Sequence, residues 1–341
     1  MHNAIDAVGI IANPASGKDI RRLVAHALVF DTPAKINIIR RVLLGLNSAG
    51  IEHVFYMPDQ SQMVQQAASA IELNLDIEPI SGCREGSVGD TIQAARSMAA
   101  LGVKVIISLG GDGTNRALVK GTRDIPLVPI SSGTNNVFPS FVDGTVAGLA
   151  AAAIAQGFAD VAEVAPRCKI ITVDLDEEPS ELALIDVGIM DGMYAGSRAI
   201  WQVDALREVI LTCARPDVIG LAALGGMIGS VTPEEDNGLH VRLANSAGCD
   251  SNSSSKFLRA AIGPGLVETI NIAQSSYLPF GSVVSVTGPA LLAFDGEREL
   301  YLKHNYSASM SIDRSGPPVV DISRCLSAAR DAGFLSDAKI T

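Results

Sequence analysis

The sequence predicts an α/β N-terminal domain with a parallel sheet, followed by a C-terminal domain rich in antiparallel β-strands. In the first half, short apolar runs alternate with stretches of helical spacing, which is typical of βαβ units. In the second half, apolar and polar residues alternate strictly, as in antiparallel strands with one face in water. At 341 residues, the chain is also longer than a single hydrophobic core usually allows.

The first half contains three strand-like runs separated by helical patterns. The runs are residues 8–11, 51–56 and 103–109. Residues 90–99 carry apolar side chains three or four positions apart, as on one face of a helix. Ser87 and Asp90 have the spacing of a capping box before this helix, and Gly102 provides a stop. These patterns predict a parallel sheet with crossover helices.

The second half contains two clear alternating runs, residues 239–244 and 306–313, which predict antiparallel strands. Residues 245–255 read as a polar hairpin loop after the first of these runs. One helix is expected at about Ser197 to Ala214. We interpret Gly225-Gly226 as a site where the backbone packs closely against a neighbouring segment.

A final helix is expected after Pro317-Pro318, with Ser323 as its candidate cap and Gly333 as its stop. We therefore divide the chain into three parts. These are a nucleotide-binding domain at residues 1–160, a β-rich substrate domain at 161–316 and a C-terminal segment at 317–341.

Composition and charge narrow the functional class. The formal net charge of −11 argues against a nucleic-acid-binding protein, which needs a basic surface. No stretch reaches the roughly 18 uncharged residues of a transmembrane segment, and the first residues do not resemble a secretory signal. The five cysteines form no Cys-x-x-Cys pair, which argues against a zinc site or a disulfide framework. We therefore expect a cytoplasmic protein.

The strongest functional motif is a glycine-rich turn between a strand and a helix, Gly110-Gly111-Asp112-Gly113-Thr114. Free backbone N–H groups and the positive end of the helix dipole favour a phosphate there, and glycine lets the backbone approach it. A carboxylate beside phosphates is useful if it binds Mg²⁺ or accepts a proton from an attacking hydroxyl. Asp112 is therefore the candidate catalytic residue. The alternative is a plain glycine turn with Asp112 as helix N-cap.

Two further segments place small polar residues directly after short strands. The first is Asn-Pro-Ala-Ser-Gly-Lys after the first strand, for which a solvated basic turn is the alternative. The second follows residues 126–130. In a doubly wound sheet, the carboxyl ends of the strands share one edge, where ligands bind. The candidate nucleotide-binding residues in these segments are Asn13, Ser16, Gly17, Gly133, Thr134 and Asn135.

These motifs resemble those of a known superfamily. The Gly-Gly-Asp-Gly-Thr turn is similar to that of ATP-NAD kinases, diacylglycerol kinases and sphingosine kinases. Residues 13–17 and 133–136 are similar to the first and third nucleotide-binding motifs of the lipid-kinase branch. Asp295-Gly296-Glu297 resembles the Asp-Gly-Glu of that branch, whose acidic residues help with metal and phosphate.

Over the whole chain, the sequence most resembles the ATP-NAD kinase-like family of acetoin catabolism protein X. The resemblance is carried by residues 13–19, 133–138 and 196–201. It implies a nucleotide site in a cleft between the two domains, ATP and Mg²⁺ as cofactors, and Asp295 and Glu297 as candidate metal ligands. It also implies that the C-terminal segment returns to the first domain.

The sequence departs from the superfamily pattern in two places. Asn136 stands where the lipid-kinase branch typically has aspartate. The Asn-Glu pair and the Thr-Pro-Thr-Gly-Ser segment with which NAD kinases hold the dinucleotide are absent, and Thr232-Pro233-Glu234-Glu235 does not replace them. The donor site is therefore predicted more firmly than the acceptor site.

The resulting hypothesis is an ATP-dependent phosphotransferase that acts on a hydroxyl of NAD or of another small alcohol. One alternative is a lipid-type kinase, which would need an apolar tunnel in the second domain. The other is a non-catalytic nucleotide-binding regulator linked to acetoin catabolism. The expected partners are a nucleotide and a small-molecule acceptor. A homo-oligomer formed through an exposed strand edge is also plausible.

Overall fold

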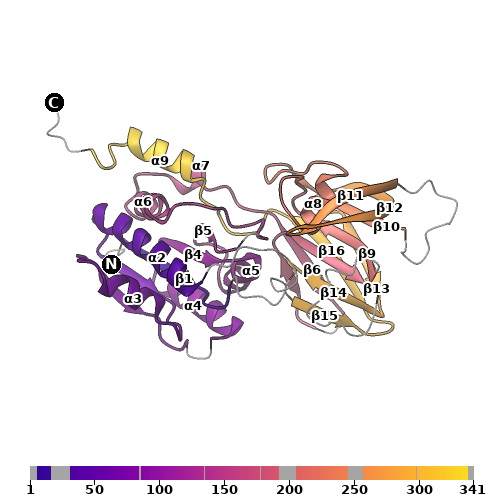
Figure 1. Ribbon diagram of the computed structural model, residues 1–341, viewed down its shortest axis with the longest axis horizontal. Helices are drawn as coiled ribbons and strands as arrows, with labels where there is room; N and C mark the ends of the chain where they lie inside the picture. Colours follow the sequence, from indigo (N-terminus) through magenta and orange to yellow (C-terminus); the bar gives the residue numbers. More distant parts are fainter. Residues whose placement is uncertain are drawn as a thin grey trace.

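The computed structural model describes residues 6–16, 31–83, 86–133, 135–176, 178–191, 205–244, 256–296 and 298–336. These residues form two lobes (Figure 1). The N-terminal lobe contains the elements from β1 to α7 together with the last helix, α9, and the C-terminal lobe contains those from β6 to β16.

The N-terminal lobe is built on a parallel sheet. Its strands are β1 (Ala7–Ala12), β2 (His53–Tyr56), β3 (Asp76–Pro79), β4 (Val105–Gly110) and β5 (Leu127–Ser131). They lie in the order β3-β2-β1-β4-β5, and every neighbouring pair is parallel. All residues of β1, β4 and β5 are buried, because helices cover both faces of the sheet. The predicted α/β fold class is confirmed.

Helices cover this sheet in two layers. They are α2 (Thr32–Ser48), α3 (Met63–Ser69), α4 (Val88–Ala100), α5 (Asp112–Gly121), α6 (Gly144–Ala155) and α7 (Val161–Val164). One core contains apolar side chains of α2, α3 and α6, and a second core contains those of α4 and α5. The predicted capping box of Ser87 and Asp90 is present at the start of α4, and Gly102 has a φ of 75° beyond its end.

The C-terminal lobe is a sandwich of two antiparallel sheets. Its strands are β6 (Ile170–Leu175), β7 (Glu181–Ala183), β8 (Asp186–Met190), β9 (Leu206–Leu211), β10 (Asn237–Leu243), β11 (Lys256–Gly263), β12 (Leu266–Pro279), β13 (Val283–Thr287), β14 (Ala290–Phe294), β15 (Arg298–Leu302) and β16 (Ser307–Asp313). One sheet has the order β11-β12-β10-β9-β8-β14-β15, and the other has the order β13-β16-β6-β7. An apolar core lies between them, and helix α8 (Leu221–Gly226) packs on the outer face of the larger sheet.

Two local predictions in this lobe need correction. The expected helix at 197–214 is wrong for residues 206–211, which form β9 between β8 and β10; residues 192–204 lie outside the described part. Strand β9 is buried on both faces, so its apolar run lacks the alternation that marks an exposed strand. The predicted loop at 245–255 also lies outside the described residues.

The last helix is α9 (Ile322–Asp331), and its N-cap is Asp321 and not the predicted Ser323. The carboxylate of Asp321 accepts a hydrogen bond from the backbone N–H of Arg324 (3.0 Å). Carboxylates are favoured at this position because they also face the positive end of the helix dipole. Gly333 follows the helix with a φ of 86°. Glycines 225 and 226 are closely packed, as predicted, against Leu211 and the backbone of Arg215.

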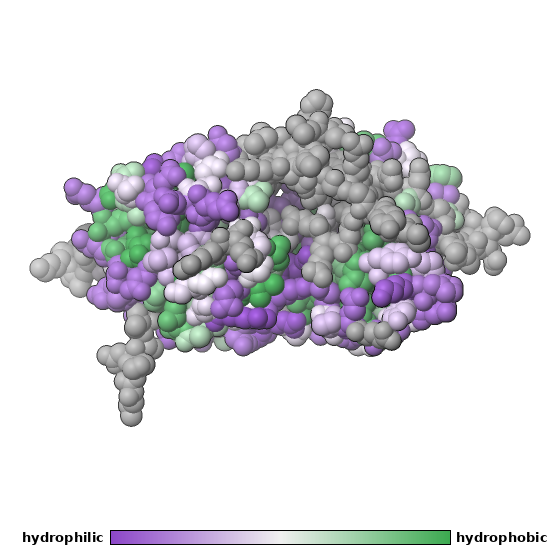
Figure 2. Space-filling model, turned by 90° about the horizontal axis from the view of Figure 1, so that it is seen from below, coloured by the Kyte–Doolittle hydropathy of each residue, from purple (hydrophilic) through white to green (hydrophobic). Residues whose placement is uncertain are grey.

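Two connecting segments, residues 165–169 and 314–321, join the lobes side by side. The backbone N–H of Cys168 donates to Pro317 O (3.0 Å), and that of Leu127 in β5 donates to Pro318 O (2.9 Å). Helix α9 then packs on α6 in the N-terminal lobe (Figure 1). On the face shown in Figure 2, hydrophobic and hydrophilic residues are interspersed. Within the described residues, no helix combines the length and the apolar character that a membrane crossing requires.

Candidate functional site

The strand order creates a switch point between β1 and β4. Strands β2 and β3 lie on one side of this pair of strands, and β5 lies on the other. The loops that follow β1 and β4 therefore leave the sheet at the place where ligands bind in open α/β sheets. The backbone N–H of Asn13 donates to Leu109 O (3.0 Å), and that of Ser132 donates to Gly110 O (3.2 Å). The first residues of all three predicted segments are thus tied to the end of β4.

Side-chain hydrogen bonds connect the three segments directly. Asn13 Nδ2 donates to Thr114 Oγ1 (2.9 Å), which links the loop after β1 to the glycine turn. The hydroxyls of Ser16 and Ser132 lie 2.7 Å apart, which links the same loop to the segment after β5. The structure therefore brings together residues that are about 100 positions apart in the sequence. We call the described residues 13–16, 110–114, 131–133, 135 and 136 the cradle.

The glycine turn is too tight for larger residues. A Cβ atom on Gly110 would lie 2.5 Å from Thr114 Cβ, and one on Gly111 would lie 2.9 Å from Asn136 Oδ1. Helix α5 begins directly after this turn, so its first backbone N–H groups and the positive end of its dipole face the cradle. Such a helix start, approached by backbone without side chains, is suited to a phosphate group.

Asp112 lies in the first turn of α5 and is almost fully buried. Its carboxylate accepts hydrogen bonds from the backbone N–H groups of Val137 (3.1 Å) and Phe138 (2.8 Å). The candidate catalytic residue therefore also fixes the chain that follows the third segment.

Asn136, which departs from the family pattern, has a defined structural role. Its Nδ2 donates to Ser131 Oγ (2.9 Å) and to Gly133 O (3.3 Å). A carboxylate at this position could not donate to the carbonyl oxygen of Gly133. The amide therefore fits the conformation of this segment better than aspartate would.

Lys35 in α2 supports the cradle from outside, and sequence reasoning missed it. Its side chain is 0% exposed. Its Nζ donates to the backbone oxygens of Asn13 (3.0 Å), Pro14 (3.1 Å) and Ser16. These carbonyl groups are therefore turned toward α2, and the ammonium adds positive charge behind the loop. The available signal was a lysine in the apolar stripe of α2, four positions before Ile39.

The remaining predicted residues divide into three groups. Gly113, Gly133 and Asn135 belong to the cradle; the two glycines are buried and Asn135 is exposed. Gly17, Thr134 and Glu297 lie outside the described residues. Asp295 lies in the C-terminal lobe, where its carboxylate accepts hydrogen bonds from Leu184, Ile185 and Asp186 N–H and lies 3.8 Å from Arg116 Nε. The described residues contain no group of three or more acidic, histidine or cysteine side chains that could hold a metal ion, so the metal site stays a prediction.

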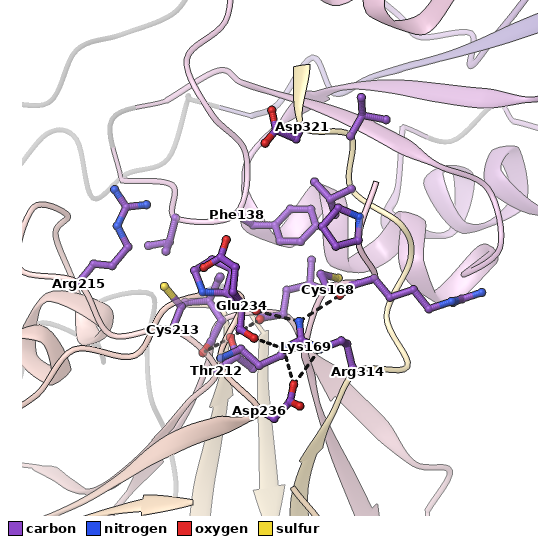
Figure 3. Close-up of a pocket in the computed structure, with 18 of the residues that line it drawn as sticks. Phe138, Cys168, Lys169, Thr212, Cys213, Arg215, Glu234, Asp236, Arg314 and Asp321 are labelled. Atoms are coloured by element: carbon purple, nitrogen blue, oxygen red, sulfur yellow. Dashed lines mark hydrogen bonds and ion pairs between the residues drawn. The ribbon is translucent and has the colours of Figure 1, made fainter. Parts of the chain in front are cut away.

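A pocket of about 470 Å³ lies between the lobes (Figure 3). It is lined by both connecting segments, by the turn between β7 and β8, and by residues that follow β9. Phe138 contributes to its wall from the N-terminal lobe. Because Asp112 holds the backbone of Phe138, the pocket adjoins the cradle.

The two cysteines of this pocket are not activated nucleophiles. Burial raises the pKa of Cys168 to about 12 and raises the pKa of Cys213 as well. Both thiols therefore stay protonated near neutral pH, and only the thiolate is an effective nucleophile. The described part of the pocket thus favours binding and positioning over covalent cysteine chemistry.

Comparisons with known proteins agree with this division into two lobes. A family model described as the ATP-NAD kinase N-terminal domain matches residues 8–158, and one described as the acetoin catabolism protein X C-terminal domain matches residues 169–315. The chain is similar to yeast NADH kinase in its crystal structure complexed with NADH. The identity is 14% and the TM-score is 0.49, over 100% of this chain and 91% of that chain.

The chain is also similar to acetoin catabolism protein X of Cupriavidus necator. The two are 33% identical over 334 residues, which cover 94% of this chain and 91% of the relative. The aligned region therefore includes both lobes of this chain. This chain belongs to the acetoin catabolism protein X family, with an N-terminal domain of the ATP-NAD kinase type.

Proposed function

We propose that this protein is an ATP-dependent phosphotransferase that phosphorylates a hydroxyl of a small molecule held between the lobes. The observation that carries the proposal is the convergence of three loops at the switch point of the sheet, beside the start of α5. Such a place suits the phosphates of a nucleotide. Membership of a family with an ATP-NAD kinase N-terminal domain supports this choice.

In this proposal, the nucleotide phosphates lie on the turn from Gly110 to Thr114. Asn13 and Ser16 would contact them from one side, and Gly133 and Asn135 from the other. The predicted residues Gly17 and Thr134 lie outside the described residues. Mg²⁺ bound to the phosphates would neutralise developing charge, and most of its ligands would be phosphate oxygens and water. The buried Lys35 supports the loop from 13 to 16 and favours the anion electrostatically.

The chemistry then needs positioning and one proton transfer. The backbone N–H groups of the turn are already oriented, so they can stabilise charge on the phosphoryl group without reorganisation. Asp112 would accept the proton of the attacking hydroxyl. Its hydrogen bonds to Val137 and Phe138 would hold the carboxylate in place for this task.

The pocket favours a small polar acceptor over a lipid. Its volume of about 470 Å³ lies within the range typical of small-molecule sites. Lys169, Arg314, Glu234 and Asp236 are among the residues of its wall. A long acyl chain would have to desolvate these groups, which is costly. A nucleotide-binding regulator without turnover is the second candidate, because Asp112 has a structural role that would exist without catalysis.

Gly111→Val is expected to abolish nucleotide binding while leaving the protein folded. The new side chain would meet Asn136 and occupy the space proposed for a phosphate. In the wild-type protein, ATP with Mg²⁺ at about a hundred times its dissociation constant should add about 2.7 kcal/mol to stability. Thermal unfolding with and without ATP, ADP or NAD measures this. Gly89→Val, at an exposed position in the first turn of α4 where φ is not positive, tests the effect of a glycine substitution outside the cradle. A full nucleotide shift in Gly111→Val would move the site elsewhere.

NAD is expected to be a poor phosphoryl acceptor, with kcat/KM well below about 10⁴ M⁻¹s⁻¹. The segments with which NAD kinases hold the dinucleotide are absent, and a site built to pair a substrate hydroxyl loses much rate when those groups are missing. Formation of NADP from NAD and ATP, read with an NADP-specific dehydrogenase, measures this. Efficient NADP formation would show instead that an unfamiliar pocket serves an ordinary NAD kinase.

A further inference from the structure

The pocket between the lobes contains a buried ammonium group without an ion-pair partner among the described residues. Lys169 is 4% exposed and lies in the wall of the pocket (Figure 3). Its Nζ donates to two backbone oxygens, Thr232 O (2.7 Å) and Asn237 O (2.8 Å). An ammonium has three N–H donors, so one remains without a partner in the described part of the chain.

The acidic residues near Lys169 are engaged elsewhere or lie at a distance. Asp236 pairs with Arg314 (2.7 Å), which also donates to backbone oxygens of the same loop. Glu234 and Glu235 attract the ammonium without an ion pair, and Glu235 accepts from the N–H of Thr232 (2.8 Å). Burial lowers the pKa of Lys169 to about 8, so it is mostly charged at pH 7. A buried charge that the protein does not neutralise is costly, and such groups cluster at functional sites.

Most basic residues in the wall of the pocket are paired with carboxylates. Its wall contains five basic residues, which are Arg167, Lys169, Arg215, Arg314 and Arg324. It contains three acidic residues, which are Glu234, Asp236 and Asp321. Three of the arginines are paired, Arg167 with Asp124 (3.3 Å), Arg215 with Asp217 (2.6 Å) and Arg314 with Asp236 (2.7 Å). Lys169 is therefore the buried charge of this wall that has no ion-pair partner among the described residues, and it attracts an anion locally.

The rest of the pocket wall determines which kind of ligand body, beyond the charged group, can fit. Phe138, Leu184, Ile185 and Val319 present apolar side chains to the pocket. The hydroxyl of Thr212 donates to Leu184 O (2.6 Å) and so is directed to the protein backbone. A ligand in this space would therefore be held by one charged end and by a short apolar body.

We propose that this pocket binds a small molecule with a carboxylate or phosphate group, whose oxygen accepts the third hydrogen bond of Lys169 Nζ. Its short apolar body packs against Phe138 and Ile185. The molecule would be the phosphoryl acceptor, and in that respect the inference rests on the proposed function. Binding itself requires no nucleotide, so the two can fail separately.

The test is calorimetric titration of the protein without nucleotide. The probes are inorganic phosphate, methyl phosphate, lactate and 2-hydroxyisobutyrate, which separate phosphate from carboxylate recognition. At least one is expected to bind saturably at pH 7. Lys169→Met should weaken this binding roughly tenfold or more, because a charge-assisted hydrogen bond is lost. Lys104→Met, a lysine at the start of β4, should leave it unchanged.

Two further measurements keep the test decisive if Lys169→Met does not fold. Val319→Trp fills the pocket from the segment 314–321 and retains Lys169, so it should also abolish binding. In the wild-type protein, affinity should fall as the pH rises through about 8, because the ammonium loses its proton. Failure of every probe at millimolar concentration, or full binding in Lys169→Met, would overturn the inference. Binding that is lost in Gly111→Val but kept in Val319→Trp would place the anion at the glycine turn, and would also overturn it.

Discussion

Asp112→Asn is expected to lower phosphoryl transfer by about 10²- to 10⁴-fold, because the amide cannot accept the proton of the attacking hydroxyl. This corresponds to roughly 3 to 5 kcal/mol of activation free energy. Nucleotide affinity should change far less, and a rise is reasonable because a negative charge beside the phosphates is removed. Initial rates of ADP formation with the best acceptor, together with the dissociation constant of the nucleotide, measure both effects.

The structural role of Asp112 has to be separated from this catalytic effect. Asparagine keeps one acceptor oxygen for the backbone N–H of Phe138 but loses the charge assistance, which costs about 1 to 3 kcal/mol of stability. Urea unfolding of the same variant measures that loss. Asp331→Asn, at an exposed ion pair with Arg330, is the matched control and should change neither quantity appreciably. Unchanged turnover in a folded Asp112→Asn protein would rule out the base role. Wild-type binding without any transfer would favour the regulator.

Arg116→Met is expected to reduce the free energy of unfolding by about 3 to 5 kcal/mol, because it leaves a buried carboxylate without its cation. The side chains of Arg116 and Asp295 are 8% and 0% exposed. Arg116 also lies over the ring of Phe294, 5.6 Å from its centre. Urea denaturation monitored by circular dichroism measures the loss.

Two comparisons test this explanation. Arg330→Met removes an exposed ion pair with Asp331 and should cost less than about 1 kcal/mol. The double variant Arg116→Met/Asp295→Asn should recover part of the loss, because no unpaired charge remains. A loss below about 1 kcal/mol in Arg116→Met would contradict the account. Since α5 also carries the glycine turn, this ion pair connects the proposed phosphate site to the C-terminal lobe.

The fold could be predicted because its local patterns are strong. The capping box at Ser87 and Asp90, the apolar run of β4 and the alternation of β16 each depend on a few neighbouring residues. Strand β9 could not be recognised, because a strand buried on both faces has no period of its own. The N-cap of α9 is Asp321, two positions before the predicted Ser323. The sequence could not distinguish the two, because aspartate and serine are both favoured N-cap residues.

The candidate site could be predicted only in part. Asn13, Ser16 and Asn135 could be predicted as neighbours, because polar residues that follow the strands of one parallel sheet lie at the same edge. Lys35 and Lys169 could not be predicted, because their hydrogen-bond partners are backbone oxygens, which no sequence pattern reveals. The partner of Asp295 was hidden for a related reason. Its ion pair with Arg116 joins two lobes whose relative placement is set by tertiary packing.

The most direct test of the proposed nucleotide site is a crystal structure of the protein with Mg²⁺ and a non-hydrolysable ATP analogue. We expect phosphate oxygens within hydrogen-bond distance of the backbone N–H groups of the turn from Gly110 to Thr114. We also expect contacts from the loop containing Asn13 and Ser16. A nucleotide bound away from this turn, or no nucleotide at a concentration that saturates binding in solution, would contradict the proposal.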